Sequence, residues 1–303
     1  LIEEAPGRVQ ALLRRGPAQT AVLGDFLRRW LVAYLFVAAT ACAAGAHDAP
    51  PAPPAPHVVT IIAVDFAFAA PDTVPAGLTT IRMINTGHEP HQAVVAGAPH
   101  KSFADLQAAL LREGAFPEWL IFPGGAGVVN SGDSSIVTVN LQPGNYLILC
   151  YIASLDGTLH INKGMYRRLV VVPAPAGTRA TAEPAADVTV TLSDYAFRLS
   201  APLTAGTHTI RVENTGPQLH ELTIERLAPG KTLADWKTRV AGGMRGTPPS
   251  QPSGGLTGPD RGKVGWLTIT LAPGNYLLNC YVPDVKDAKP HFMHGMVEEI
   301  VIK

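Results

Sequence analysis

Short runs rich in β-branched residues recur along the chain from His57 onward, and each run is bounded by Gly, Pro, Asn or Asp. Runs of this kind are typical of β-strands, because branched side chains pack well on a pleated surface. In the first half of the chain they lie at residues 57–64, 78–84, 136–141, 146–150 and 168–172, and the second half repeats them. The pattern therefore predicts a chain built mainly from strands.

One segment in each half departs from this pattern. Ser102 with Asp105, and Thr232 with Asp235, have the spacing of a capping box, and helix-spaced apolar residues follow each pair. We therefore expect one short helix in each half. Its predicted ends are the glycines that follow, Gly114 and Gly242.

Self-comparison shows that residues 57–303 contain one unit written twice, at an offset of 129 to 131 residues. The matched segments are 65–68 with 194–197, 85–87 with 214–216, 102–106 with 232–236, and 143–147 with 273–277. Two long copies indicate two domains and not a solenoid, whose units are shorter and more numerous. We expect domains at 57–173 and 187–303, joined by a Pro/Ala/Thr-rich linker at 174–186. Strands with one helical insertion per copy predict an all-β fold of two tandem Greek-key β-sandwiches.

Composition narrows the classes of function. The chain has 47% hydrophobic and 16% charged residues, which excludes disorder for most of its length. Its 24 basic and 24 acidic side chains cancel, so there is no overall positive field for a nucleic-acid backbone. We therefore expect no nucleic-acid partner.

The first 48 residues are typical of a targeting region. Arg28 and Arg29 precede an uncharged apolar run and then small residues, the layout of a secretory signal, and the run is too short to predict a spanning helix. Residues 49–56 form a Pro/Ala linker. We expect an exported protein, periplasmic or at the cell surface. Cys42 after Ala-Thr-Ala resembles a bacterial lipoprotein box, so a lipid anchor there is the alternative to simple cleavage.

Each copy carries the same set of metal-binding residue types: an early His, a Cys 59 or 60 residues later, and then a His and a Met. The two sets are His91, Cys150, His160 and Met165, and His220, Cys280, His291 and Met296. Two imidazoles and a thiolate with a weak axial thioether suit both Cu(I) and Cu(II), as a blue-copper electron-transfer centre requires. The early His must lie on the strand beside the Cys strand for the four to meet.

These residues resemble the cupredoxins, or type 1 copper proteins, over roughly residues 57–303. The resemblance implies that His91, His160, His220 and His291 are nitrogen ligands, Cys150 and Cys280 the thiolates, and Met165 and Met296 the axial ligands. It also implies up to two coppers per chain. The sequence departs from small family members in the nine and ten residues between Cys and the second His, where those have only a few.

The cysteines and two further histidines allow other interpretations. Cys150 bonded to Cys280 is an alternative in an oxidising compartment, although equivalent positions in two domains disfavour it. His88 and His294 lie three residues from predicted ligands, and we interpret them as surface residues or supports of the ligands.

The favoured function is electron transfer without substrate chemistry, with an unknown redox protein as partner. Copper nitrite reductases and two-domain laccases carry a His beside the type 1 Cys and His-x-His pairs. Here the neighbours of the two cysteines are Leu149 with Tyr151 and Asn279 with Tyr281, and no His-x-His occurs. A copper-delivery protein without redox turnover, whose long Cys–His loops would release metal, is the second hypothesis. An oligomeric multicopper enzyme is the third.

Overall fold

The computed structural model describes residues 52–112 and 116–303, and the predicted targeting region with Cys42 lies outside them. We call residues 57–173 the first repeat and residues 187–303 the second repeat. The strands of the first repeat are β1 (His57–Val64), β2 (Ala67–Ala69), β3 (Thr73–Pro75), β4 (Gly77–Asn85), β5 (His91–Ala98), β6 (Pro123–Val129), β7 (Ser134–Leu141), β8 (Gly144–Leu149) and β9 (Tyr166–Val172). Those of the second are β10 (Val188–Ser193), β11 (Ala196–Leu199), β12 (Gly206–Asn214), β13 (Leu222–Leu227), β14 (Ser250–Pro259), β15 (Val264–Leu271), β16 (Gly274–Asn279) and β17 (Val297–Ile302).

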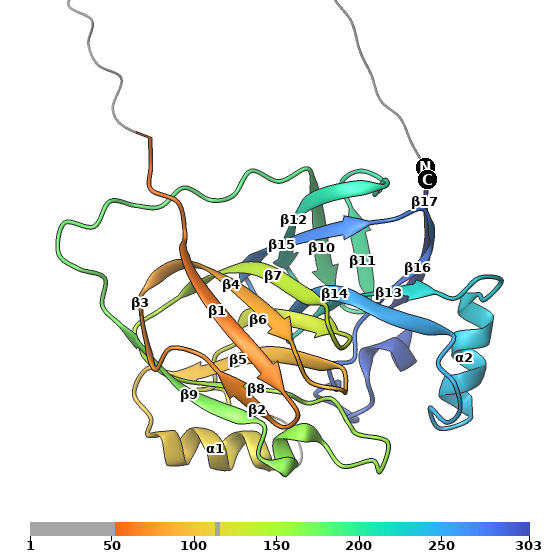
Figure 1. The fold of residues 1–303 in the computed structure, drawn as a ribbon, viewed down its shortest axis with the longest axis horizontal. Coiled ribbons are helices and arrows are strands. Elements are labelled where there is room, and N and C mark those ends of the chain that lie inside the picture. Colours follow the sequence, from red (N-terminus) through yellow and green to blue (C-terminus); the bar gives the residue numbers. More distant parts are fainter. Residues whose placement is uncertain (1–51, 113–115) are drawn as a thin grey trace, which may run out of the picture. The chain divides into compact units, whose positions relative to one another are not determined.

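The strands form two mixed sheets that pack on a common core, so the predicted all-β sandwich class is confirmed (Figure 1). Alternation places every second side chain inside, as in β1, where Val59, Ile61 and Ala63 are buried. These residues pack in one cluster with Val95 and Ile148 of the opposite sheet. The core is therefore made by the inner faces of both sheets.

Both sheets run through the two repeats without interruption. Their strand orders are β11-β10-β12-β15-β7-β4-β1-β2 and β17-β16-β13-β14-β6-β5-β8-β9-β3. The repeats meet where β7 pairs with β15 and β6 pairs with β14, both antiparallel (Figure 1). The backbone groups of these four strands are satisfied by the other repeat, and no open edge remains at the junction.

The junction is pseudo-symmetric. Val137 lies opposite Leu267, and Ala126 lies opposite Leu256. In each pair the second residue is the counterpart of the first at the repeat offset of 130. The residues on either side of such a pair meet reciprocally, since Thr138 lies opposite Trp266 and Ile136 lies opposite Thr268, and this reciprocity makes the contact isologous, as in a two-fold dimer. The repeats are therefore arranged as two subunits of a symmetric pair would be.

A side-chain hydrogen bond joins the two repeats at each end of the junction, and a proline at one end decides which group donates. The Asn130 side-chain amide donates to the Pro252 carbonyl at 3.2 Å. At the related place the Phe122 backbone N–H donates to Asp260 Oδ2 at 2.6 Å. Pro252 has no N–H, so its partner must donate, whereas the Phe122 N–H needs an acceptor.

The predicted helices are present with the predicted start signals. Helix α1 (Phe103–Leu111) and helix α2 (Leu233–Ala241) each begin with a complete capping box, from Ser102 and Thr232. Helix α2 ends at Gly242 as expected. The C-cap of α1 is Arg112, before the predicted stop at Gly114, which lies outside the described residues.

Each repeat also contains a short 3-10 helix that the sequence pattern did not predict. These are η1 (His160–Lys163) and η2 (His291–His294), and each ends at a glycine with positive φ, Gly164 or Gly295. A single tight turn of this length has too few residues for a hydrophobic period.

Among residues 52–112 and 116–303, no helix is long and apolar enough to cross a bilayer.

Asp260 gives a testable property of the junction. Burial raises its pKa to about 6, against the opposing effects of the Phe122 N–H and Lys263. An acid whose folded-state pKa exceeds its unfolded-state pKa binds more protons when folded, so its contribution to stability falls as pH rises from about 4 to about 6. We expect Asp260→Asn, which keeps an acceptor for Phe122, to be more stable than the parent at pH 7 by about 1 to 2 kcal/mol.

Urea unfolding of the parent and of Asp260→Asn between pH 4 and pH 7 checks this expectation. The stability difference should shrink toward zero at the acid end. Parallel stability curves over that range would show that the Asp260 carboxyl carries no folding penalty.

Candidate metal centres

In the first repeat, backbone pairing brings the predicted ligands to one end of the nine-stranded sheet. Cys150 follows β8 directly, His160 begins η1, and Met165 directly precedes β9. His91 is the first residue of β5, which pairs antiparallel with β8. The early His thus comes from the strand beside the Cys strand, as the sequence analysis required.

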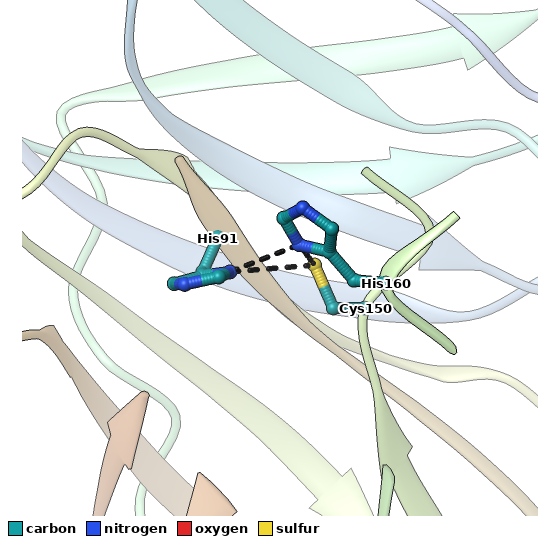
Figure 2. A group of neighbouring side chains, drawn as sticks. All are labelled: His91, Cys150 and His160. Carbon is teal, nitrogen blue, oxygen red and sulfur yellow. Dashed lines mark hydrogen bonds between the residues drawn. The ribbon is translucent and has the colours of Figure 1, made fainter. Parts of the chain in front are cut away.

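The donor atoms of His91, Cys150 and His160 converge in the interior (Figure 2). The Nδ1 atoms of the two imidazoles lie 3.1 Å apart. The Cys150 Sγ atom is 3.4 Å from His160 Nδ1 and 4.0 Å from His91 Nδ1. All three side chains are fully buried. Two nitrogens and one sulfur therefore face a single point, from which solvent is excluded.

Met165 is held beside this group through its backbone. Its N–H donates to the His160 carbonyl at 2.9 Å, and its carbonyl accepts from the Cys150 N–H at 3.2 Å. The side chain is fully buried in the main core. The 3-10 turn η1 and its Gly164 cap thus connect the second His to the Met by a fixed backbone path.

The second repeat builds the same arrangement. The Nδ1 atoms of His220 and His291 are 3.0 Å apart, and Cys280 Sγ lies 3.3 Å from His291 Nδ1. Met296 is buried, and its N–H donates to the His291 carbonyl at 3.0 Å. The structure therefore gathers His, Cys and His of each predicted set, with the Met adjacent along the chain.

Carboxylates hold the outer nitrogens of the early histidines. His91 Nε2 lies 2.9 Å from Asp65 Oδ1, and His220 Nε2 lies 2.7 Å from Asp194 Oδ1. An acceptor on Nε2 fixes the tautomer that leaves Nδ1 free to bind a metal. Sequence reasoning did not assign Asp65 and Asp194 to the sites. Their signal was the repeated segment at 65–68 and 194–197, which was used only to align the copies.

The second histidine of each site also faces a carboxylate, but the two repeats supply it from different places. In the first repeat Glu89, just before His91, contacts His160 Nε2 at 2.9 Å. In the second repeat Gln218 takes the place of Glu89, and Asp284 of the Cys–His loop lies 3.8 Å from His291 Nε2. Gln218 donates to Asp284 at 2.9 Å. The nearest carboxylate thus comes from the loop in the second repeat, and at 3.8 Å it leaves His291 Nε2 without a hydrogen-bond partner among the described residues.

Burial sets the protonation of the donor groups. It raises the pKa of the Cys150 thiol to about 11 and that of the Cys280 thiol further. It lowers the pKa of His291 to about 4, with the nearby His220 adding to the effect. Burial alone would raise the pKa of Asp65, but hydrogen bonds from the His88 and Glu89 backbones and from His91 lower it to about 2. Burial also lowers the pKa of His91 and His220, which favours the neutral, metal-binding form of these rings, whereas each thiol must lose a proton to a metal.

Two imidazoles and one thiol fit copper well. Imidazole suits both copper oxidation states, and a thiolate with a buried thioether nearby favours Cu(I). The His91, His160 and Cys150 atoms need no backbone movement to share one ion, since all three lie within 4.8 Å of one another. The same holds for His220, His291 and Cys280.

The remaining candidates do not join these centres. Cys150 and Cys280 are free and lie in separate clusters, so the disulfide alternative is wrong. His88 is exposed, and its backbone N–H donates to Asp65. His294 is exposed, stacks on Tyr195 and contacts Asp287 at 3.1 Å, in a group whose third member, Asp284, is buried. Asp284 and Asp287 already accept hydrogen bonds inside their own loop, from the backbones of Lys286 and Lys289.

No protein-family model and no curated protein matches the chain. Several solved structures are similar to it. Auracyanin from Roseiflexus castenholzii is 22% identical, over 40% of this chain and 100% of its own, with a TM-score of 0.29. A multicopper oxidase is 15% identical over 81% of this chain and 88% of its own, with a TM-score of 0.25. A copper-containing nitrite reductase from Thermus scotoductus is 13% identical over 81% and 61%, with a TM-score of 0.23.

The carboxylate on the early histidine should govern metal affinity. Asp194 is the better test, because Asp65 also holds the turn that contains His88 and Glu89. In a Cys150→Ser background, which leaves the second centre, we expect Asp194→Ala to weaken Cu(I) binding about 10- to 100-fold, since the His220 ring loses its anchor. Competition against a Cu(I) chelator measures this change. Asp72→Ala, at an exposed ion pair with Arg167, is the control and should leave affinity unchanged.

Proposed function

We propose that this protein is a copper-binding electron-transfer protein with a mononuclear type 1 copper site in each repeat. The observation that carries the proposal is the buried His/Cys/His donor set, found twice with the same atoms turned inward. When bound, copper would supply a Cu(I)/Cu(II) couple for outer-sphere transfer of one electron.

The contribution of the chain is a site that changes little between the two oxidation states. Asp65 and Asp194 fix the early imidazoles, and the backbone bonds of η1 and η2 fix the later ones. The burial of all donors keeps water from adding as a ligand. A preorganised and dry site favours fast electron transfer, because little has to rearrange when the charge changes.

Two features of the described residues support a carrier over the other hypotheses. The Cys–His loops are internally bonded: Ser154 N–H donates to the Thr158 carbonyl, and Asp284 N–H to the Lys289 carbonyl. These bonds favour a carrier over the delivery hypothesis, which needs mobile loops. Among residues 52–112 and 116–303, neither centre has a third histidine that could serve an open catalytic copper.

We also propose that the mature protein is exported, to the periplasm or the cell surface, and exchanges electrons with another redox protein. The charged-then-apolar segment before residue 48 supports export, and Cys42 is the place where a lipid anchor would attach. With no net charge, partner docking would depend on local patches near the copper ends of the repeats.

Copper loading of the purified mature chain tests the proposal. We expect two Cu(II) equivalents per chain, an intense visible charge-transfer band and reversible reduction. Cys150→Ser and Cys280→Ser should each remove one equivalent and about half of the band, because each removes one thiolate.

Tight Cu(I) binding without the visible band would instead favour delivery. Retention of two equivalents by both single variants would show that the ligand assignment is wrong. Rapid turnover of nitrite or of a phenolic substrate by the copper-loaded chain would favour the enzyme hypothesis.

A further inference from the structure

The two centres differ in the layer that lies between the nine-stranded sheet and the helix. Beneath α1, β5 presents Val94 and Ala96, which pack with Leu106 and Leu110 of the helix. Beneath α2, the matching strand β13 presents Glu225 at the position of Ala96, and Glu221 precedes it at the position of Gln92. Both glutamates are more than nine-tenths buried. The second repeat therefore carries two interior carboxyl groups where the first has none.

Glu221 is tied to the peptide that follows the copper-site cysteine. Its Oε1 atom accepts from the Tyr281 N–H at 3.0 Å, and its own N–H donates to Cys280 Sγ at 3.4 Å. It also directly follows His220 in the sequence. The carboxyl group is thus fixed within one residue of two donors of the second centre.

Glu225, four residues after Glu221, is the second buried carboxyl group. Its Oε1 accepts from the Tyr281 hydroxyl and its Oε2 from the Ser250 hydroxyl, both at 2.5 Å. The Tyr281 ring packs on Phe292, which in turn packs on Trp236 of α2. In the first repeat the hydroxyl of Tyr151 donates to the Leu110 carbonyl of the helix instead. Glu225 therefore positions Tyr281, whereas Glu221 is the group that meets the centre.

We propose that Glu221 makes the second centre the weaker electron acceptor, so that a single electron in the half-reduced protein rests in the first repeat. This inference rests on the proposed function. A carboxylate beside a buried centre stabilises the higher positive charge of Cu(II) relative to Cu(I), and the amide of Gln92 does not. When one electron passes from the second centre to the first, Cu(I) of the second repeat becomes Cu(II) and Cu(II) of the first becomes Cu(I). No bond is made or broken.

Variants that keep only one centre allow the reduction potential of each centre to be measured separately. Cys280→Ser retains the first centre and Cys150→Ser the second. In redox titrations at pH 8.5 followed by the visible band, we expect the first centre to have the higher potential. The expected difference is about tenfold or more in the electron-exchange equilibrium, or about 59 mV for each tenfold in a one-electron couple.

Swapping the residue types of Glu221 and Gln92 tests whether this position causes the difference in reduction potential. Glu221→Gln in the Cys150→Ser protein should raise the potential by about the same tenfold factor, and Gln92→Glu in the Cys280→Ser protein should lower it. Asp187→Asn also removes one carboxylate from the second repeat, but at the end of β10 away from Asp194, and should leave the potential unchanged. If Glu221→Gln fails to bind copper, Gln92→Glu decides the question.

Electron paramagnetic resonance of the intact protein gives a second readout. At half reduction, the remaining Cu(II) spectrum should match that of the Cys150→Ser protein. Equal potentials in two fully loaded centres, or a change below twofold in both exchange variants, would overturn the inference and leave the proposed function standing. Absence of copper binding or of reversible reduction in the parent chain would instead overturn the proposed function.

Discussion

The antiparallel pairing of β5 with β8, and of β13 with β16, is the constraint on which both centres depend. A histidine and a cysteine 59 or 60 residues apart can share an ion only if their strands are neighbours in register. The ladder fixes this register, because a slip of one residue would turn the side chains to the other face of the sheet. The short turns η1 and η2 then bring the second histidine back to the same end.

The same register also sets which histidine nitrogen atoms need a hydrogen-bond acceptor outside the site. With the Nδ1 atoms turned inward, each Nε2 atom points to the outside of the site and needs an acceptor. Asp65 and Asp194 meet this need in the same way, and Glu89 meets it for His160, whereas Asp284 lies 3.8 Å from His291 Nε2, beyond hydrogen-bond distance. The geometry at the donors is thus the same in both repeats, while the groups around them differ.

The junction shows how two such units can share one pair of sheets. Each of β6 and β7 pairs with its own counterpart, so the contact has the form of a symmetric dimer within one chain. Close approach there leaves no room for side chains at some positions. A Cβ atom at Gly127 would lie 2.5 Å from the Gly255 backbone nitrogen, a distance that only a glycine avoids. Because the repeats pair through backbone and glycine, the two candidate metal centres lie outside the junction and can differ.

The sequence by itself determined five of the strands in each repeat, the capped helices, the repeat and the two sets of His, Cys, His and Met, because these depend on local pattern and on matching within the chain. It did not reveal that Asp65 supports His91, nor that the carboxylate near the second histidine is Glu89 in one repeat and Asp284 in the other, since local pattern does not say which distant side chains meet. It also gave no sign that Glu221 lies inside, beside Cys280. Which face of a strand meets a helix, and which strand edge meets the other repeat, is decided by packing of the whole chain, and only the tertiary structure supplies it.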